Sequence, residues 1–289
     1  MGTSQSSDGP GPGVPMVPPW TPAAPQDPAG PAPPAGDPDV PPGEAPADGV
    51  PVPPPAAPPP GLQPPPLAPE KRFGGVRSSL GSFARSGDAH DLRRGLGHYV
   101  RSGYGGSNTA TRRFGGTAQT AGSLGHALYS TANRTADAPV DADALAGRST
   151  EEIATAIIEA VRPVDGTQDA EAERAAIHDA MSDLLTEFPD ADLLDLSDAE
   201  RDFVIERFTA IDVARRFELD VGKHLLERAA TATVAMARLK QMRSYIAETV
   251  AASFRKLRDQ GRTLTAGRIA RVVQDALRDT FEVFEGYEE

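Results

Sequence analysis

Proline is confined almost entirely to the N-terminal part of the chain. Residues 1–70 hold 26 of the 29 prolines, and only Pro139, Pro163 and Pro189 follow them. With so few large apolar side chains, this segment cannot bury enough surface to offset the entropy that ordering would cost. Its proline runs favour the open polyproline II helix, which has no internal hydrogen bonds. We therefore predict a long, disordered, proline-rich tail over residues 1–70, with the folded part of the chain after it.

Charge is distributed as unevenly as proline. Residues 1–70 contain seven acidic residues and no lysine or arginine, whereas residues 71–135 contain ten basic residues against Asp88 and Asp91. Residues 136–289 have an acidic excess again, and the whole chain has a formal net charge of −12. Because this value averages three unlike regions, partners must be considered for each region separately. We divide the chain into the tail, a basic Gly/Arg-rich region with short helices (71–135) and an α-helical domain (136–289).

The composition excludes several classes of protein. The chain has no cysteine, which removes disulfides, thiol nucleophiles and thiolate metal sites and suits a reducing cytoplasm. It has no run of eighteen apolar residues, as a membrane-spanning helix would need. The first basic residue is Lys71 and no apolar segment follows the start, so a secretory signal is not expected. We predict a soluble, cytoplasmic protein with no membrane partner.

Five segments of residues 136–289 have helical periodicity and recognisable ends. The signals are the capping boxes Ser149/Glu152 and Ser197/Glu200, the stops Pro163, Pro189 and Gly261, and the starts Thr231 and Thr265. No alternating apolar pattern, which would be typical of strands, competes with them. The sequence therefore predicts an all-α fold, a helical bundle preceded by the tail.

Residues 71–135 combine glycine, arginine and aromatic residues. The sequence Arg-Phe-Gly-Gly starts at Arg72 and again at Arg113, and residues 88–101 between the two copies have helical spacing. We expect Gly103 to close that helix. The region is therefore predicted to form one or two short helices separated by glycine turns.

The aromatic residues between these arginines allow two interpretations. They are Phe73, Phe83, Tyr99, Tyr104 and Phe114. Either the rings stack on bases while the arginines bind phosphates, or the rings belong to the core and the arginines contact acidic protein surface. The second interpretation is favoured because no nucleic-acid-binding module can be recognised. The candidate contacts in both cases are Arg93, Arg94, Arg101, Arg112 and Arg113.

No catalytic or metal-binding pattern can be recognised in the sequence. The histidines, His90, His98, His126, His178 and His224, have no metal-ligand spacing. The aspartates between residues 190 and 198 lack the glycine and the terminal glutamate of a calcium loop. No serine lies in a nucleophile elbow. We predict a protein that is not an enzyme and that needs no cofactor or metal.

The N-terminus is the most distinctive chemical feature of the sequence. Removal of Met1 before the small Gly2 exposes an α-amine on a residue without a β-carbon. Such an amine has an ordinary pKa of roughly 7.7–8.0, so part of it is neutral and nucleophilic near neutral pH. The only tryptophan, Trp20, follows in a proline-stiffened segment and is suited to anchor an interface.

Several long words of the sequence resemble the QatB family of the bacterial Qat anti-phage defence systems. They are residues 1–4 (MGTS), 17–20 (VPPW), 92–106 (LRRGLGHYVRSGYGG), 111–118 (TRRFGGTA), 159–168 (EAVRPVDGTQ), 249–258 (TVAASFRKLR) and 281–287 (FEVFEGY). The resemblance runs nearly from end to end. Proteins of this family are encoded beside an ATPase, a QueC-like enzyme (QatC-type) and a TatD-like nuclease.

The resemblance implies a role that composition alone could not indicate. The chain would be a partner and substrate of the QueC-like enzyme, which would join the ATP-activated carboxyl of a 7-deazaguanine to the amine of Gly2 as an amide. The residues expected to dock on the enzyme are Thr3, Ser4, Val17, Pro18, Pro19 and Trp20. The system's ATPase and TatD-like nuclease are further expected partners. The alternative hypothesis is a nucleic-acid-binding adaptor that uses the basic region 71–135.

Overall fold

The computed structural model describes residues 15–17, 71–265 and 267–288. All but three residues of the predicted tail lie outside this described part. Within it the regular secondary structure is helical and includes no β-strand, which confirms the all-α prediction. The elements are α1 (Gly74–Ser86), α2 (Ala89–His98), η1 (Tyr99–Gly103), α3 (Ser107–Arg113), α4 (Gly115–Ala132), α5 (Ala142–Leu145), α6 (Thr150–Val161), α7 (Gln168–Glu187), α8 (Asp198–Arg228), α9 (Ala232–Asp259), α10 (Ile269–Glu285) and η2 (Gly286–Glu288).

The capping signals of the C-terminal helices act as the sequence predicts. Ser149 and Ser197 each accept a hydrogen bond from the third residue of their helix, and the glutamate there returns one, so both capping boxes form. Thr231 caps α9 through its side chain. Gly261 follows that helix with a φ of 76°, a backbone conformation that favours glycine. These four signals are confirmed.

The start of α10 differs from the prediction. The helix begins at Ile269 rather than near Thr265. Gly267 has a φ of 82°, and a residue in this left-handed conformation cannot belong to a right-handed helix. The helix therefore starts only after this glycine.

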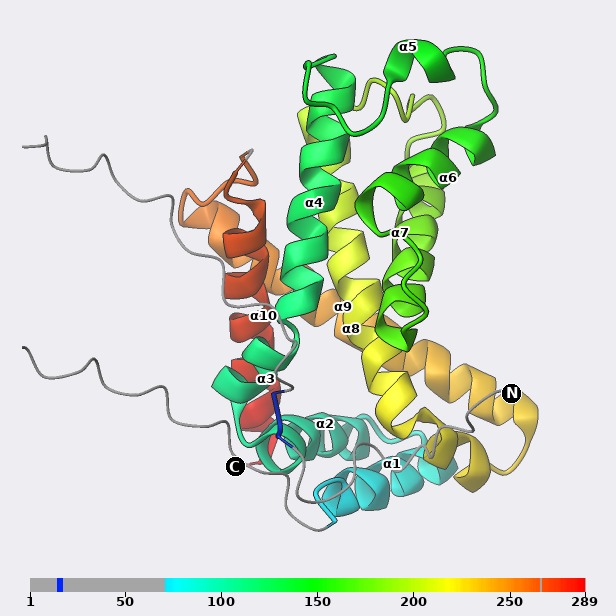
Figure 1. Ribbon diagram of the computed structural model, residues 1–289. Coiled ribbons are helices and arrows are strands. Elements are labelled where there is room, and N and C mark those ends of the chain that lie inside the picture. Colours follow the sequence, from blue (N-terminus) through cyan, green and yellow to red (C-terminus); the bar gives the residue numbers. More distant parts are fainter. Residues whose placement is uncertain (1–14, 18–70, 266, 289) are drawn as a thin grey trace, which may run out of the picture.

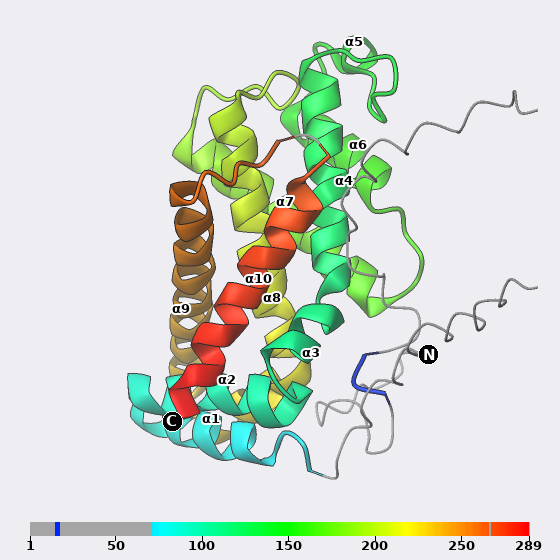
Figure 2. The ribbon, with the colours of Figure 1, turned by 90° about the vertical axis from the view of Figure 1, so that its left-hand side faces the viewer.

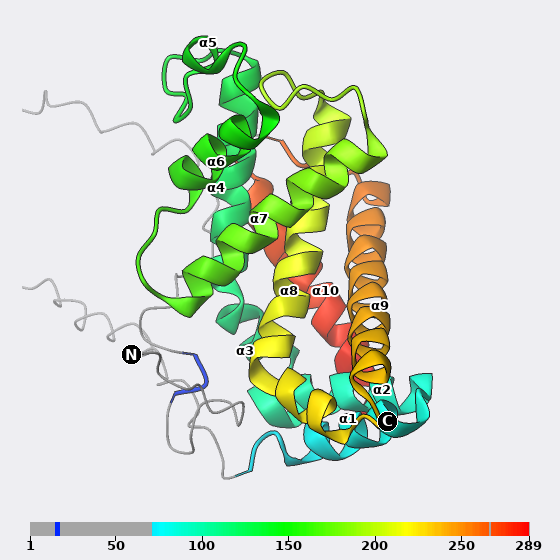
Figure 3. The ribbon, with the colours of Figure 1, turned by 90° about the vertical axis from the view of Figure 1, so that its right-hand side faces the viewer.

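The long helix α8 lies at the centre of the bundle (Figure 1). It packs against α7 and α9 along its length, against α4, and against α1 near its C-terminal end. Helix α10 runs obliquely between α4 and α9 (Figure 2) and also contacts α3 and α2. Figure 3 shows α7 beside α8 on the opposite side of the molecule. Helices α1 and α2 lie across one end of the bundle, and α5 and α6 lie at the other.

The glycine-rich region contains more helix than the sequence predicts. Four α-helices, α1 to α4, replace the expected one or two, and α4 alone has 18 residues. Its glycines permit close helix packing: a β-carbon on Gly125 would lie 2.2 Å from Cδ1 of Ile269 in α10. Gly103 does not close α2, because the π-helix η1 continues the chain from Tyr99 to Gly103. Close packing, which propensity does not report, thus accounts for the extra helix.

The aromatic residues of this region lie in the core, as the favoured interpretation predicts. All five are at most 2% exposed: Phe73, Phe83, Tyr99, Tyr104 and Phe114. Tyr99 packs against Phe217 of α8 with a ring separation of 4.5 Å, and Phe114 packs against Phe281 of α10 at 4.9 Å. The helices of residues 71–135 therefore share one hydrophobic core with those that follow.

Candidate functional site

Three residues of the N-terminal region lie against the folded body. In this tail segment, residues 15–17, Met16 is only 5% exposed. A β-carbon on Gly105 would lie 3.1 Å from the Met16 sulfur, so the thioether occupies the space that this glycine leaves free. The tail segment, blue in Figures 1, 2 and 3, lies beside α3 in all three views.

The contact forms on a turn of residues 103–106, which we call the glycine turn. Gly105 and Gly106 have φ values of 73° and 106°, which side chains disfavour. The amide of Gly106 donates to the carbonyl oxygen of Val100 at 3.0 Å. The next amide, that of Ser107, donates to Oε2 of Glu285 at 3.1 Å. Bonds to η1 and α10 thus fix the turn that receives Met16.

Two tyrosines next to the glycine turn share one carboxylate. The hydroxyl groups of Tyr99 and Tyr104 donate to Oδ2 of Asp220 at 2.9 and 2.6 Å. Burial, more than the neighbouring groups, raises the pKa of Asp220 above its ordinary value. Burial and the nearby Asp220 charge likewise raise the pKa of both tyrosines, so they remain donors at neutral pH. The cluster attaches η1 and the turn to α8.

Arg72 covers the outer side of these rings. The residue is 5% exposed, and its guanidinium carbon lies 4.6 Å from the Phe73 ring centre and 5.4 Å from that of Tyr104. Its Nε and Nη2 atoms have no hydrogen-bond partner. The interaction with the ring faces and the negative field of Asp220 therefore hold this cation.

A second arginine holds three carboxylates together deeper in the bundle. Arg216 of α8 is 6% exposed. Its guanidinium lies 2.9 Å from Asp212, 3.0 Å from Asp169 and 2.5 Å from Glu173. Burial alone would lower the pKa of Arg216, but the three acids raise it. The positive charge is therefore firmly retained between α7 and α8.

Hydrogen bonds from α4 and α6 complete this polar network. Thr117 donates to Asp212 at 2.6 Å, and Glu173 accepts from Thr120 at 2.9 Å and from Nε of Arg162 at 2.7 Å. Burial and then the adjacent Asp212 raise the pKa of Glu173. The network is thus a charged joint between helices that are distant in sequence.

Asp169 connects this network to α3. Burial disfavours its charged form, but Arg216 and Arg113 outweigh that effect and lower its pKa. Nη1 of Arg113 lies 3.3 Å from Oδ2 of Asp169. The candidate contact Arg113 is therefore engaged within the chain, as the favoured interpretation of the basic region predicts.

The other predicted site residues lie apart from each other or outside the described part. Gly2, Thr3, Ser4, Pro18, Pro19 and Trp20 are outside it. Val17 is half-buried in the tail segment. Arg93 and Arg94 are exposed on α2, Arg101 on η1 and Arg112 on α3. Since the five aromatic residues are buried, they are not placed to stack on bases.

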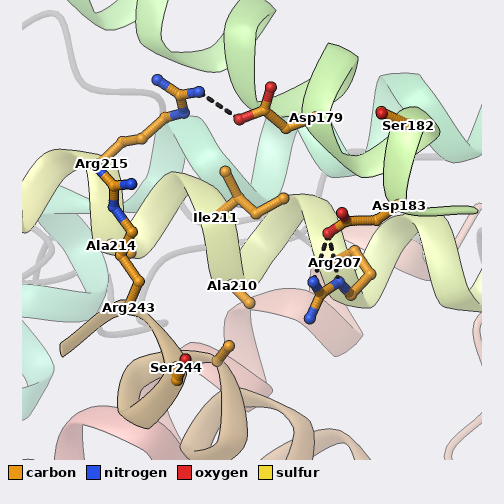
Figure 4. A pocket seen from close by; sticks show the side chains of 11 residues that line it. Asp179, Ser182, Asp183, Arg207, Ala210, Ile211, Ala214, Arg215, Arg243 and Ser244 are labelled. Atoms are coloured by element: carbon orange, nitrogen blue, oxygen red, sulfur yellow. Dashed lines mark hydrogen bonds and ion pairs between the residues drawn. The ribbon is translucent and has the colours of Figure 1, made fainter. Parts of the chain in front are cut away.

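A groove of about 380 Å³ lies on the far side of α8, between α7 and α9 (Figure 4). Its floor is Ala210, Ile211 and Ala214, and its walls carry ion pairs. Nε of Arg207 lies 3.0 Å from Oδ2 of Asp183, and Arg215 donates to Asp179. The lining includes Ser182 and Ser244 but no histidine, so the groove holds no serine–histidine pair. The charges on its walls connect neighbouring helices.

Comparison with known proteins identifies the family. The family model for the Qat anti-phage system associated protein QatB matches residues 105–284. The chain belongs to the QatB family. The matched region begins at Gly105, the residue against which Met16 packs, and extends almost to the end of α10. No curated protein and no solved structure matches the chain.

Family membership gives the chain a role in anti-phage defence, as a component of a Qat system. None of the helices in the described part is long and apolar enough to cross a membrane. The described residues also bring together no group of three or more acidic or histidine side chains that could hold a metal ion.

Sequence reasoning missed the residues on which this site depends. Trp20, rather than Met16, was the expected anchor of the tail. The one available signal was the apolar pair Met16–Val17 within a proline-rich segment. Asp220 and Glu173 gave no signal, because their partners lie far away in the sequence.

Proposed function

We propose that this chain is a non-enzymatic component of Qat defence that presents its N-terminus to a QueC-like enzyme of the system. The enzyme would conjugate a 7-deazaguanine to Gly2 after removal of Met1. The ATP-activated carboxyl forms an amide bond with the Gly2 nitrogen, the activating group leaves, and the amine loses a proton. The ATPase and the TatD-like nuclease are further proposed partners.

The observation that carries this proposal is the contact between the tail segment and the glycine turn, in a chain that belongs to a Qat family. A tail segment attached to the body next to the N-terminus holds that terminus near one face of the protein. The α-amine is also the most reactive amine available, because lysine has an ordinary pKa near 10.4. The chain has only four lysines: Lys71, Lys223, Lys240 and Lys256.

The intact mass of the chain, purified after co-expression with the other genes of its system, tests the proposal. We expect an added mass on the wild-type chain, which disappears when the QueC-like gene is omitted. Gly2→Pro, which leaves a hindered secondary amine, should abolish the addition, whereas Gly2→Ala keeps a primary amine and serves as the matched control. An unmodified chain in cells with active defence, or an addition that persists in Gly2→Pro, would contradict the proposal.

A further inference from the structure

The chain contacts the glycine turn at two points separated by a long stretch of sequence. Met16 packs on Gly105, and Phe73 packs on Gly103, where a β-carbon would lie 2.7 Å from the ring. The described chain thus meets this turn first at the tail segment and again just before α1. The tail segment is therefore a second attachment, which divides the proline-rich region into an arm of residues 1–14 and an intervening stretch of residues 18–70.

This attachment shortens the reach of the N-terminus. Gly2 is 14 residues from Met16 but 69 residues from Lys71, where the continuous described part begins. At about 3.6 Å per fully extended residue, the arm reaches at most roughly 50 Å from the glycine turn. Without the Met16 contact the limit rises to roughly 250 Å.

The face around the turn offers exposed positive charge. Arg101 and Arg112 are exposed on either side of it, and Asn108 is exposed on α3. The nearby acids are already engaged: Glu285 accepts from the Ser107 amide and Asp169 pairs with Arg113. A partner surface that complements this face is acidic.

We propose that the tail segment is a latch that holds the N-terminal arm beside α3, and that the enzyme acting on the N-terminal amine binds this face through an acidic patch. The identity of that partner rests on the proposed function, whereas the latch does not. The latch raises the effective concentration of Gly2 at an enzyme bound there. Effective concentration falls as about the −3/2 power of tether length, so opening the latch lowers it roughly tenfold.

The latch is tested by a distance measurement on the full chain. Because the protein has no cysteine, spin labels can be placed at Ser7→Cys and Asn108→Cys alone. With the latch closed, residue 7 stays within about 32 Å of Met16. Met16→Asp should release it and broaden the label distances to a mean beyond about 40 Å, as expected for a 64-residue flexible tether. Met236→Asp, at a methionine 58% exposed on α9, is the matched control and should not change them. Equal distances in the wild type and Met16→Asp would overturn the latch.

The binding face is tested by the affinity of the QueC-like enzyme for the chain and by the rate of N-terminal modification. Arg112→Glu should weaken binding at least tenfold, while Arg255→Glu, an exposed arginine of α9, should not. Met16→Asp should lower the rate about tenfold at limiting enzyme. No binding, equal binding by both charge variants, or an unchanged or faster rate for Met16→Asp would overturn the assignment of this face. A chain that binds but is never modified would contradict the proposed function and leave the latch to the distance measurement.

Discussion

Replacing Arg216 with alanine removes the one guanidinium that contacts Asp169, Glu173 and Asp212 together. Asp212 is fully buried and Glu173 is 2% exposed, so water cannot replace the lost cation. The variant therefore leaves buried negative charge without its main partner. Breaking a buried ion pair in this way costs about 3–5 kcal/mol.

The remaining contacts set where in that range the cost falls. Glu173 keeps Arg162 and Thr120, and Asp212 keeps Thr117. We therefore expect a loss near the lower end, about 3 kcal/mol. Arg207→Ala is the matched control, because its pair with Asp183 is more than a third exposed and is worth at most about 1 kcal/mol.

Urea unfolding followed by far-UV circular dichroism measures both variants. With a urea dependence of about 3 kcal/mol/M, Arg216→Ala should lower the midpoint by roughly 1 M and Arg207→Ala by a third of that or less. The deficit of Arg216→Ala should shrink towards pH 5, because protonation neutralises the orphaned acids. A loss below about 1 kcal/mol, or one equal to that of Arg207→Ala, would refute the view that this network is a charged joint.

Two further predictions concern Asp220 and the arginines. Burial raises the pKa of Asp220 above its ordinary 3.8, so the folded state binds more protons than the unfolded state once the pH exceeds that value. Asp220→Asn should therefore gain stability relative to the wild type between pH 4 and pH 7 in urea titrations; a relative loss would contradict this sign. Because the aromatic rings are buried, changing Arg93, Arg94, Arg101 and Arg112 to alanine should leave nucleic-acid affinity at physiological salt unchanged. Salt-dependent binding that these changes abolish would instead favour the adaptor hypothesis.

The helices could be predicted because their signals are local. The capping boxes at Ser149 and Ser197 each involve residues three positions apart, and Pro163 excludes helix at its own position. Glycine misled the prediction for residues 115–132. The sequence marks glycine as a helix breaker, but Gly125 lies where Ile269 leaves no room for a β-carbon. Only the packing of α10 reveals this.

The site could be predicted only in part for the same reason. Asp212 and Arg216 are one helical turn apart, but the bond from Thr117 to Asp212 spans 95 residues. Likewise, nothing in the sequence pairs Met16 with Gly105. The basic region was interpreted correctly in one respect, since Arg113 pairs with an acid of the C-terminal part. Charge complementarity can indicate that such pairs form, but not which residues form them.

The most direct test of the proposed role is fragmentation mass spectrometry of the intact chain, purified from cells in which the complete Qat system is active. We expect every fragment that contains the N-terminus to carry the added mass, with Gly2 as the first residue. Fragments that contain only Lys71, Lys223, Lys240 or Lys256 should not carry it. An addition on one of those lysines, or a chain that is unmodified while defence operates, would contradict the account.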